Sequence, residues 1–364
     1  MDYDDDVLRE IFIRLPPQPS ALLRASLVCK CWRRLISDRG FLGRFRAYHK
    51  RPPLLGFFTT QDKAFNFIPT LDRPDRISAA RFSLKMPCGE CWSFKGCRHG
   101  LALFLNWTRH EAVVWDPLSG HQHLVAFPPE FGNDEDNLVR NAAVVCAATD
   151  RGHIHGDCHS SPFKLVLLRN SDDCTEVLAC LYDSKSGVWG HIISTQVTDV
   201  VNPLRPGILV GHALYWLLLD DSVLKYDLKW DRLDVIEMPK NSNGIAGKSH
   251  FQILRTKGNM LGLAILTRMR LQLWESMEYH DGGHTWVLQK TVHLGKLLHL
   301  GGELWDERLL IRGSDEDNNV IVVHTNGCGV LMVELESMRS KFLDGNNYIS
   351  SYYPYANFYM PGDE

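Results

Sequence analysis

The sequence predicts a multidomain α + all-β chain: a short helical domain at the N-terminus, followed by an antiparallel β-propeller of about six blades. In the first 45 positions, apolar residues recur at the spacing of three and four that marks one face of a helix. From Leu54 onward the apolar runs shorten to strand length and are separated by Gly, Pro, Asp and Asn. A turn motif then recurs along this second part at roughly the length of a propeller blade.

The N-terminal part is predicted to contain three short helices. Asp4–Asp6 places negative charge at the start of the first helix, and Pro16-Pro17 ends that helix. Ser20 is expected to cap the second helix and Gly40 to end the third, with one further apolar turn behind it. So many large apolar side chains in so small a unit indicate either a face for another protein or a cap on the core of the β domain.

The β part carries a recurring strand and turn, in which an apolar strand ends in an aromatic residue and Asp. Val113–Gly120 and Cys180–Gly187 close on glycine, Leu224–Asp231 lacks the glycine, and Leu271–Glu275 is expected to be a fourth copy. The Asp accepts hydrogen bonds from turn amides, and glycine supplies a positive φ. The expected blades cover residues 54–85, 96–128, 139–195, 205–239, 248–294 and 300–343, before a Tyr-rich tail.

Three N-terminal segments together resemble the F-box motif. They are Asp6–Pro16 (Asp-Val-Leu-Arg-Glu-Ile-Phe-Ile-Arg-Leu-Pro), Leu22–Ser26 (Leu-Leu-Arg-Ala-Ser) and Val28–Asp38 (Val-Cys-Lys-Cys-Trp-Arg-Arg-Leu-Ile-Ser-Asp). One departure is that Tyr3-Asp4 stands where the family usually has Leu-Pro. Gly211–Trp216 and Pro354–Tyr359 are similar to plant F-box-associated β domains. The predicted boundaries are therefore an F-box helical domain over 1–48, a linker over 49–53 and a target-recognition domain over 54–364.

The F-box resemblance implies two partners: a Skp-type adaptor, with a cullin–RING ubiquitin ligase behind it, and a target protein. The chain would then be the substrate receptor of a Skp–cullin–F-box ligase and would catalyse nothing itself. Two alternatives stay open, a propeller enzyme or sugar- or ligand-binding protein with a helical cap, and an F-box protein that acts without target degradation. The residues expected to contact the adaptor, or to form the core beneath that contact, are Val7, Leu8, Ile11, Leu15, Pro16, Leu22, Val28, Cys29 and Trp32.

Charge and composition exclude several other classes of function. The net charge is −3, so neither nucleic acid nor an anionic membrane is an expected partner. No apolar run approaches the ~20 residues of a membrane helix, and the acidic N-terminus does not have the pattern of a signal peptide. Ten cysteines without an export signal are expected to be reduced thiols, which predicts a cytoplasmic or nuclear protein.

Two cysteine- and histidine-rich segments are the candidates for metal chemistry. Cys88, Cys91, Cys97 and His99 offer four soft ligands within twelve residues, although the second pair is spaced too tightly for a usual zinc knuckle. The segment His153–His159 brings three histidines and Cys158 together. Structural roles are favoured for both, and no cofactor is predicted. Acidic segments 132–137 and 314–319 lack the ligand alternation of a calcium loop and are expected to be solvated turns.

Overall fold

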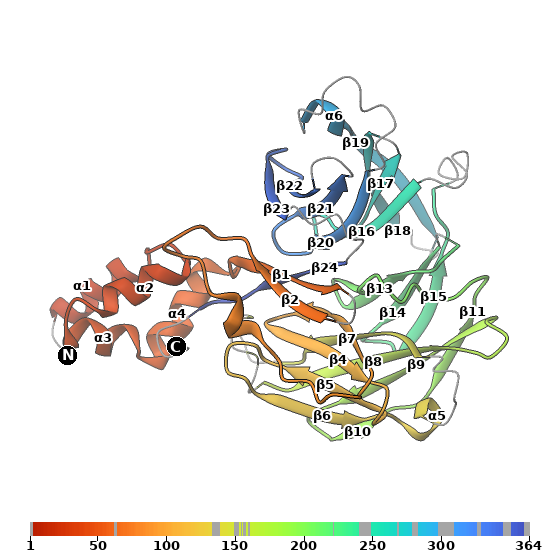
Figure 1. Cartoon of the computed structure of the whole chain (residues 1–364), viewed down its shortest axis with the longest axis horizontal. Helices are drawn as coiled ribbons and strands as arrows, with labels where there is room; N and C mark the ends of the chain where they lie inside the picture. Colours follow the sequence, from red (N-terminus) through yellow and green to blue (C-terminus); the bar gives the residue numbers. More distant parts are fainter. Residues whose placement is uncertain are drawn as a thin grey trace.

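The computed structural model (Figure 1) shows a helical unit projecting from one side of a β-propeller. The described residues are 3–61, 64–132, 139–148, 153, 155, 158, 161–220, 222–239, 249–267, 269–278, 283–297, 309–325, 329–344 and 351–359. None of the helices in these ranges is both long and apolar enough to cross a membrane.

The N-terminal domain has the three predicted helices and a fourth, which stands where only a further apolar turn was expected. They are α1 (Tyr3–Phe12), α2 (Pro19–Ser26), α3 (Lys30–Ile36) and α4 (Arg39–His49). Asp38 accounts for the fourth helix, because its side chain accepts a hydrogen bond from the backbone N–H of Phe41 at 2.9 Å and caps α4. Gly40 therefore lies in the first turn of α4 and does not end α3.

The caps of the two middle helices also differ from the predicted ones. Helix α2 begins at Pro19, whose missing N–H costs nothing in the first turn of a helix. Ser20 is consequently not its cap, and its backbone N–H donates to Asp75 of the propeller at 3.0 Å. Cys29 caps α3, with its sulfur accepting from the N–H of Trp32 at 3.4 Å. Val28 and Cys29 therefore precede α3, although they were expected within it.

The helices enclose a core of their own, to which the end of the chain contributes one side chain. Its aromatic centre includes Phe12, Phe41 and Phe45, with the rings of Phe12 and Phe41 meeting edge to face at 6.4 Å. Phe358 completes this core from beyond the propeller and is 1% exposed. Because Phe358 follows the last strand of the propeller, the two domains share buried apolar surface.

Six antiparallel sheets form the propeller, which confirms the predicted number of blades. Blade one pairs β2 (Ala64–Pro69), β1 (Leu54–Gln61) and β24 (Tyr352–Ala356). The strands of blades two and three are β3 (Trp92–Arg98), β4 (Leu101–Asn106), β5 (Glu111–Trp115) and β6 (Gln122–Ala126), then β7 (Val139–Cys146), β8 (Phe163–Asn170), β9 (Glu176–Asp183), β10 (Val188–Trp189) and β11 (Ile193–Gln196).

Blades four to six each contain four strands. Short helices α5 (Pro129–Gly132) and α6 (Leu294–Leu297) lie in connections between blades. The strands are β12 (Ile208–Val210), β13 (Ala213–Leu217), β14 (Val223–Asp227), β15 (Arg232–Ile236), β16 (Ser249–Arg255), β17 (Leu261–Thr267), β18 (Arg270–Glu278), β19 (His284–His293), β20 (Leu310–Asp315), β21 (Val320–Thr325), β22 (Gly329–Glu334) and β23 (Ser340–Asp344).

Blade one closes the ring by pairing strands from the two ends of the β domain. Strand β24 runs antiparallel to β1, with Leu54 opposite Ala356 and Thr59 opposite Tyr352. The predicted blade over 54–85 therefore supplies only β1 and β2 and takes its third strand from the tail. The 3₁₀ helix η1 (Ala79–Phe82) packs beside β2, where its buried Phe82 ring lies 4.1 Å from that of Phe67.

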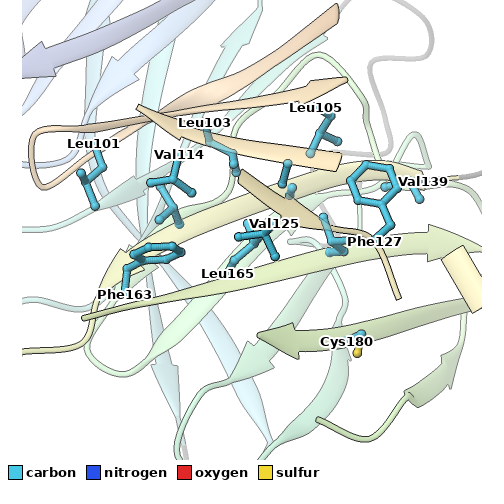
Figure 2. Packing of buried hydrophobic residues seen from close by; sticks show 14 of the residues in the cluster. Leu101, Leu103, Leu105, Val114, Val125, Phe127, Val139, Phe163, Leu165 and Cys180 are labelled. Carbon is cyan, nitrogen blue, oxygen red and sulfur yellow. The ribbon is translucent and has the colours of Figure 1, made fainter. Parts of the chain in front are cut away.

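The hydrophobic core is divided into layers between neighbouring blades. Figure 2 shows the layer between blades two and three, where Leu103 and Val114 face Leu165 across the gap. Comparable layers fill each of the other five junctions. Each sheet thus buries both faces only against its neighbours, so the array is stable as a closed ring.

The predicted turn motif joins the third and fourth strands of four blades. At Asp116, Asp183 and Asp227 the side-chain carboxylate accepts a hydrogen bond from the backbone N–H two residues further along the chain. The predicted copy at Leu271–Glu275 is wrong, because β18 continues past it to Glu278. A copy that the pattern missed begins at Glu334. The fifth residue of each turn has a positive φ: Gly120 (76°), Gly187 (74°), Asp231 (49°) and Met338 (55°).

Strand direction assigns every loop to one of two faces. The innermost strands β24, β3, β7, β12, β16 and β20 are neighbours around the axis. In an antiparallel blade the first and third hairpins lie at one edge and the second hairpin at the other. The helices leave from the first edge, since the end of β24 pairs with the start of β1. We call this edge the helical face and the other the distal face.

Phe358→Ala tests the coupling between the domains. We expect it to lower the free energy of unfolding by about 3–5 kcal/mol, because it removes a buried ring from the helical core. Chemical denaturation measures the loss, and hydrogen exchange should place it in α4. Phe342→Ala, at a ring that is 57% exposed, is the matched control. Equal stability of the two variants would show that the tail does not support the helices.

Candidate functional site: an exposed helical face and a basic axial mouth

The residues predicted to contact an adaptor divide into exposed and buried groups. On α1, Val7 and Ile11 are 46% and 52% exposed and stand one helical turn apart. Between them lies Leu8, which instead packs against the helical core. The remaining members are Val28, Cys29 and Pro16, which are exposed, and Leu15, Leu22 and Trp32, which belong to the core or pack against it.

Trp32 is held mainly by packing within the helical domain. Its ring meets that of Phe12 nearly edge to face, with centroids 4.8 Å apart. At the surface, Arg34 of α3 and Asp5 of α1 also form an ion pair at 3.1 Å between these two helices. Trp32 is therefore placed to set the spacing of α1 and α3 rather than to serve only as a contact.

One exposed apolar residue beside these was missed. Leu27 is 73% exposed in the connection between α2 and α3, next to Val28 at 62%. Helical periodicity could not identify it, because neither residue lies on a helix. Two adjacent large apolar residues in a connection are themselves a signal, since soluble monomers seldom expose contiguous apolar patches. We call Val7, Ile11, Leu27 and Val28 the apolar patch.

The axis of the propeller near the distal face is lined by cations from several blades. The Nζ of Lys95 on β3 donates to the backbone carbonyl of Arg140 at 2.9 Å, and Lys95 is only 6% exposed. Arg205 reaches across the ring and donates to Gln252 on blade five at 3.2 Å and to the carbonyl of Ile311 on blade six at 2.6 Å.

These cations act on one another electrostatically. Burial and then the Arg140 charge lower the pKa of Lys95 to about 8. Burial and then Arg312 lower the pKa of Arg205 to about 10. Over the described part of the chain, no ion pair includes Lys95, Arg140, Arg205 or Arg312. We call these four residues the basic mouth; among the described residues its positive charge has no carboxylate partner, an arrangement that favours anions.

At the helical face the axial charge is neutralised. Arg98, the last residue of β3, forms a largely buried ion pair with Glu316 and also donates to the carbonyl of Gly207 at 2.5 Å. Glu316 belongs to the segment 314–319 that was expected to be a solvated turn. Asp315 in that segment is buried, which raises its pKa to about 6. The other acidic segment, 132–137, lies almost wholly outside the described residues.

The axis has little room for a small molecule. A cavity lined by Arg98, Pro206, Glu316 and Tyr353 has a volume of about 20 Å³, enough for about one water molecule. A wider hollow of about 420 Å³ lies at the outer rim of blades two and three, beside His123.

The structure does not assemble the first predicted set of metal ligands. Cys88 and Cys91 are exposed in the connection before β3, whereas Cys97 lies on β3 and His99 in the turn behind it. Within the described ranges, the His and Cys side chains close enough to share an ion belong to a different group: Cys146, His153, His155 and Cys158. His159 of the second predicted set lies outside the described residues.

Comparison with known proteins identifies the family. The F-box domain matches residues 4–43, and the family described as "F-box protein AT5G49610-like, beta-propeller" matches residues 93–356. The chain therefore belongs to the F-box proteins with this β-propeller domain. The resemblance seen in the sequence is confirmed.

Curated relatives in Arabidopsis thaliana carry corresponding descriptions. "F-box/kelch-repeat protein At3g61590" is 26% identical over 78% of this chain and 69% of its own length. "Putative F-box/kelch-repeat protein At1g12170" is 21% identical over 96% of both chains. A solved luciferin-regenerating enzyme is 11% identical with a TM-score of 0.37, over 70% of this chain and 79% of its own, a likeness too low to bear on function.

Lys95→Met tests whether the buried positive charge of the basic mouth destabilises the folded state. At pH 7 the buried ammonium is charged despite its lowered pKa, so the variant should be more stable by about 1–3 kcal/mol. The folded lysine loses its proton near pH 8 and the unfolded one near 10.5. Between these values the stability of the wild type should rise toward that of the variant.

Urea denaturation from pH 7 to 10.5 measures this difference. Lys257→Met is the matched control, since that side chain is 64% exposed and should give no such pH dependence. If the Lys95 variant is less stable than the wild type at pH 7, the buried charge of Lys95 does not destabilise the folded state.

Proposed function

We propose that this F-box protein is the substrate receptor of a Skp–cullin–F-box ubiquitin ligase. Its helical domain binds a Skp-type adaptor, and its propeller binds a target protein in the cytoplasm or nucleus. The receptor itself performs no chemistry. It holds a target lysine near ubiquitin carried by a partner enzyme, and this raises the effective concentration of the two reactants.

The apolar patch is the observation that carries the adaptor contact. Other side chains fill the helical core, so Val7, Ile11, Leu27 and Val28 are not needed to fold it. Large apolar side chains left outside a completed core indicate a protein interface. The usual Leu-Pro is absent, but helix α1 (Tyr3–Phe12) forms without it and presents Val7 and Ile11 on the same side of the helix.

The distal face is proposed to receive the target. It points away from the helices, so a target there would not compete with the adaptor for space. The basic mouth lies at its centre, and Leu204 and Leu219 add exposed apolar surface at 66% and 50%. Leu204 lies near the axis, where its carbonyl accepts from Ser351 at 3.1 Å. This combination favours a target segment that carries negative charge beside apolar side chains.

The alternative functions receive less support. A propeller enzyme with its site at the ring axis needs convergent polar groups around a substrate-sized cavity there, and the axial cavity holds about one water molecule. An F-box protein that acts without target degradation would use the same two surfaces, so only the fate of the target separates that function from the proposed one.

Replacing two residues of the apolar patch should weaken adaptor binding. In Ile11→Glu/Val28→Glu, two charges would have to be buried at the interface, so the affinity for a Skp-type adaptor should fall at least tenfold, by about 1.4 kcal/mol or more. Calorimetric titration of the purified chain measures this. Leu124→Glu, at a residue of the propeller that is 62% exposed, is the matched control and should bind normally. Unchanged binding by the folded double variant would exclude the apolar patch as the adaptor site.

Arg312→Gln should weaken the capture of targets but not of the adaptor. Arg312→Gln removes a positive charge of the basic mouth that is not in a described ion pair. The control variant Lys257→Gln removes a positive charge at the helical face. Quantitative mass spectrometry of co-purified proteins, with the adaptor as internal standard, measures both effects. Targets should be depleted with Arg312→Gln and retained with Lys257→Gln. The reverse result would place target binding on the helical face.

A further inference from the structure

Two cysteines and two histidines converge where β7 ends. Cys146 is the last residue of β7, and His153, His155 and Cys158 follow in the connection that leads to β8. Its ends are joined by a hydrogen bond from the N–H of Ala147 to the carbonyl of Pro162 at 2.8 Å. One donor atom from each of the four side chains lies within 4.8 Å of every other.

The distances between these donor atoms suit a tetrahedral ion. The sulfur of Cys146 lies 3.3 Å from Nε2 of His153, and the sulfur of Cys158 lies 3.5 Å from that same nitrogen. Cys158 also lies 3.5 Å from Nδ1 of His155. Zinc bonds of about 2.3 Å to sulfur and 2.0–2.1 Å to nitrogen give a tetrahedral sulfur–nitrogen edge of about 3.5 Å.

His99 supports this group from the neighbouring blade. Its ring stacks on that of His155 with centroids 3.4 Å apart and planes 6° apart. Its Nδ1 accepts a hydrogen bond from the backbone N–H of Cys146 at 3.1 Å, which fixes both partners. Outer contacts of this kind orient the side chains that bind a metal. Of the first predicted set, His99 contacts two of these residues, as a support for the ligands.

We propose that Cys146, His153, His155 and Cys158 form a structural zinc site. Two thiolates and two imidazoles suit zinc, whereas magnesium and calcium require oxygen ligands. Four protein ligands complete a tetrahedral shell and leave no position for substrate, so the role is structural. The ion fastens the connection between β7 and β8 onto the helical face of the propeller.

The position of the site links it to the closure of the ring. His99 precedes Gly100, where an added Cβ would lie 2.7 Å from the side chain of Asn357. Asn357 follows β24, and the next residue is Phe358 of the helical core. A zinc-bound connection therefore packs, through His99, close to the segment that joins the propeller to the helices.

The test is the metal content of the full-length chain. Protein expressed with zinc and purified under reducing conditions without chelator should contain about one zinc per chain by mass spectrometry of the metal. Cys146→Ser/Cys158→Ser should lose it, whereas Cys88→Ser/Cys91→Ser, the matched control at two exposed cysteines, should retain it. Absence of zinc from the folded, reduced wild type overturns the proposal. So does loss of zinc from the Cys88/Cys91 variant alone.

A titration without substitutions covers the case in which the cysteine variant does not fold. Cobalt added to the metal-free wild type should give the intense visible bands of tetrahedral cobalt bound to two thiolates. Zinc should then displace it. Chelation should also lower the melting temperature of the wild type, because an ion that binds only the folded state stabilises it. Weak octahedral cobalt bands, with no change in melting temperature, contradict the site.

Discussion

The pairing of β1 with β24 is the constraint on which the rest of the structure depends. Every sheet of the propeller leaves two apolar faces that only its neighbours can cover, so an open array would expose a layer at each end. The ladder from Leu54 and Ala356 to Thr59 and Tyr352 removes those open ends. It also brings Phe358 into the helical core, so the closure of one domain completes the other.

The same pairing determines how the two surfaces are arranged. Because the helices leave the ring at the edge where β24 ends, the apolar patch and the basic mouth lie on opposite sides of the propeller. Charge follows this division. Arg98 is neutralised by Glu316 at the helical face, whereas the four cations of the basic mouth have no described carboxylate partner at the distal face. Such separated and chemically different surfaces suit the proposed role, in which the helical domain and the propeller each bind a different protein.

Local sequence signals predicted the class of each element better than its boundaries. The turns at Asp116, Asp183 and Asp227 could be recognised because Asp and an aromatic residue recur together. The turn at Glu334 escaped because it lacks the aromatic-Asp pair: Val333 and Glu334 stand in those two positions, and Met338 occupies the positive-φ position. The prediction that Gly40 ends α3 was wrong. Glycine often ends a helix, but here Asp38 caps the start of α4 two residues before it.

The sites depend on contacts between distant segments, and these were beyond local patterns. Periodicity placed Leu8 and Ile11 on one stripe, yet only the packed helices show that Leu8 faces inward and Ile11 outward. The histidine-rich segment was recognised, but Cys146 and His99 belong to other strands and turns that only the fold brings there.

The late position of Phe358 has a consequence for synthesis on the ribosome. The four helices emerge first, but their core lacks one large aromatic ring until almost the whole propeller has been translated. Domains generally begin to fold as they emerge, so the helical domain spends most of translation without its last core residue. Polypeptides truncated within the propeller would therefore carry a weakened helical domain, and if this domain binds an adaptor as proposed, incomplete chains would compete for it less well than complete ones.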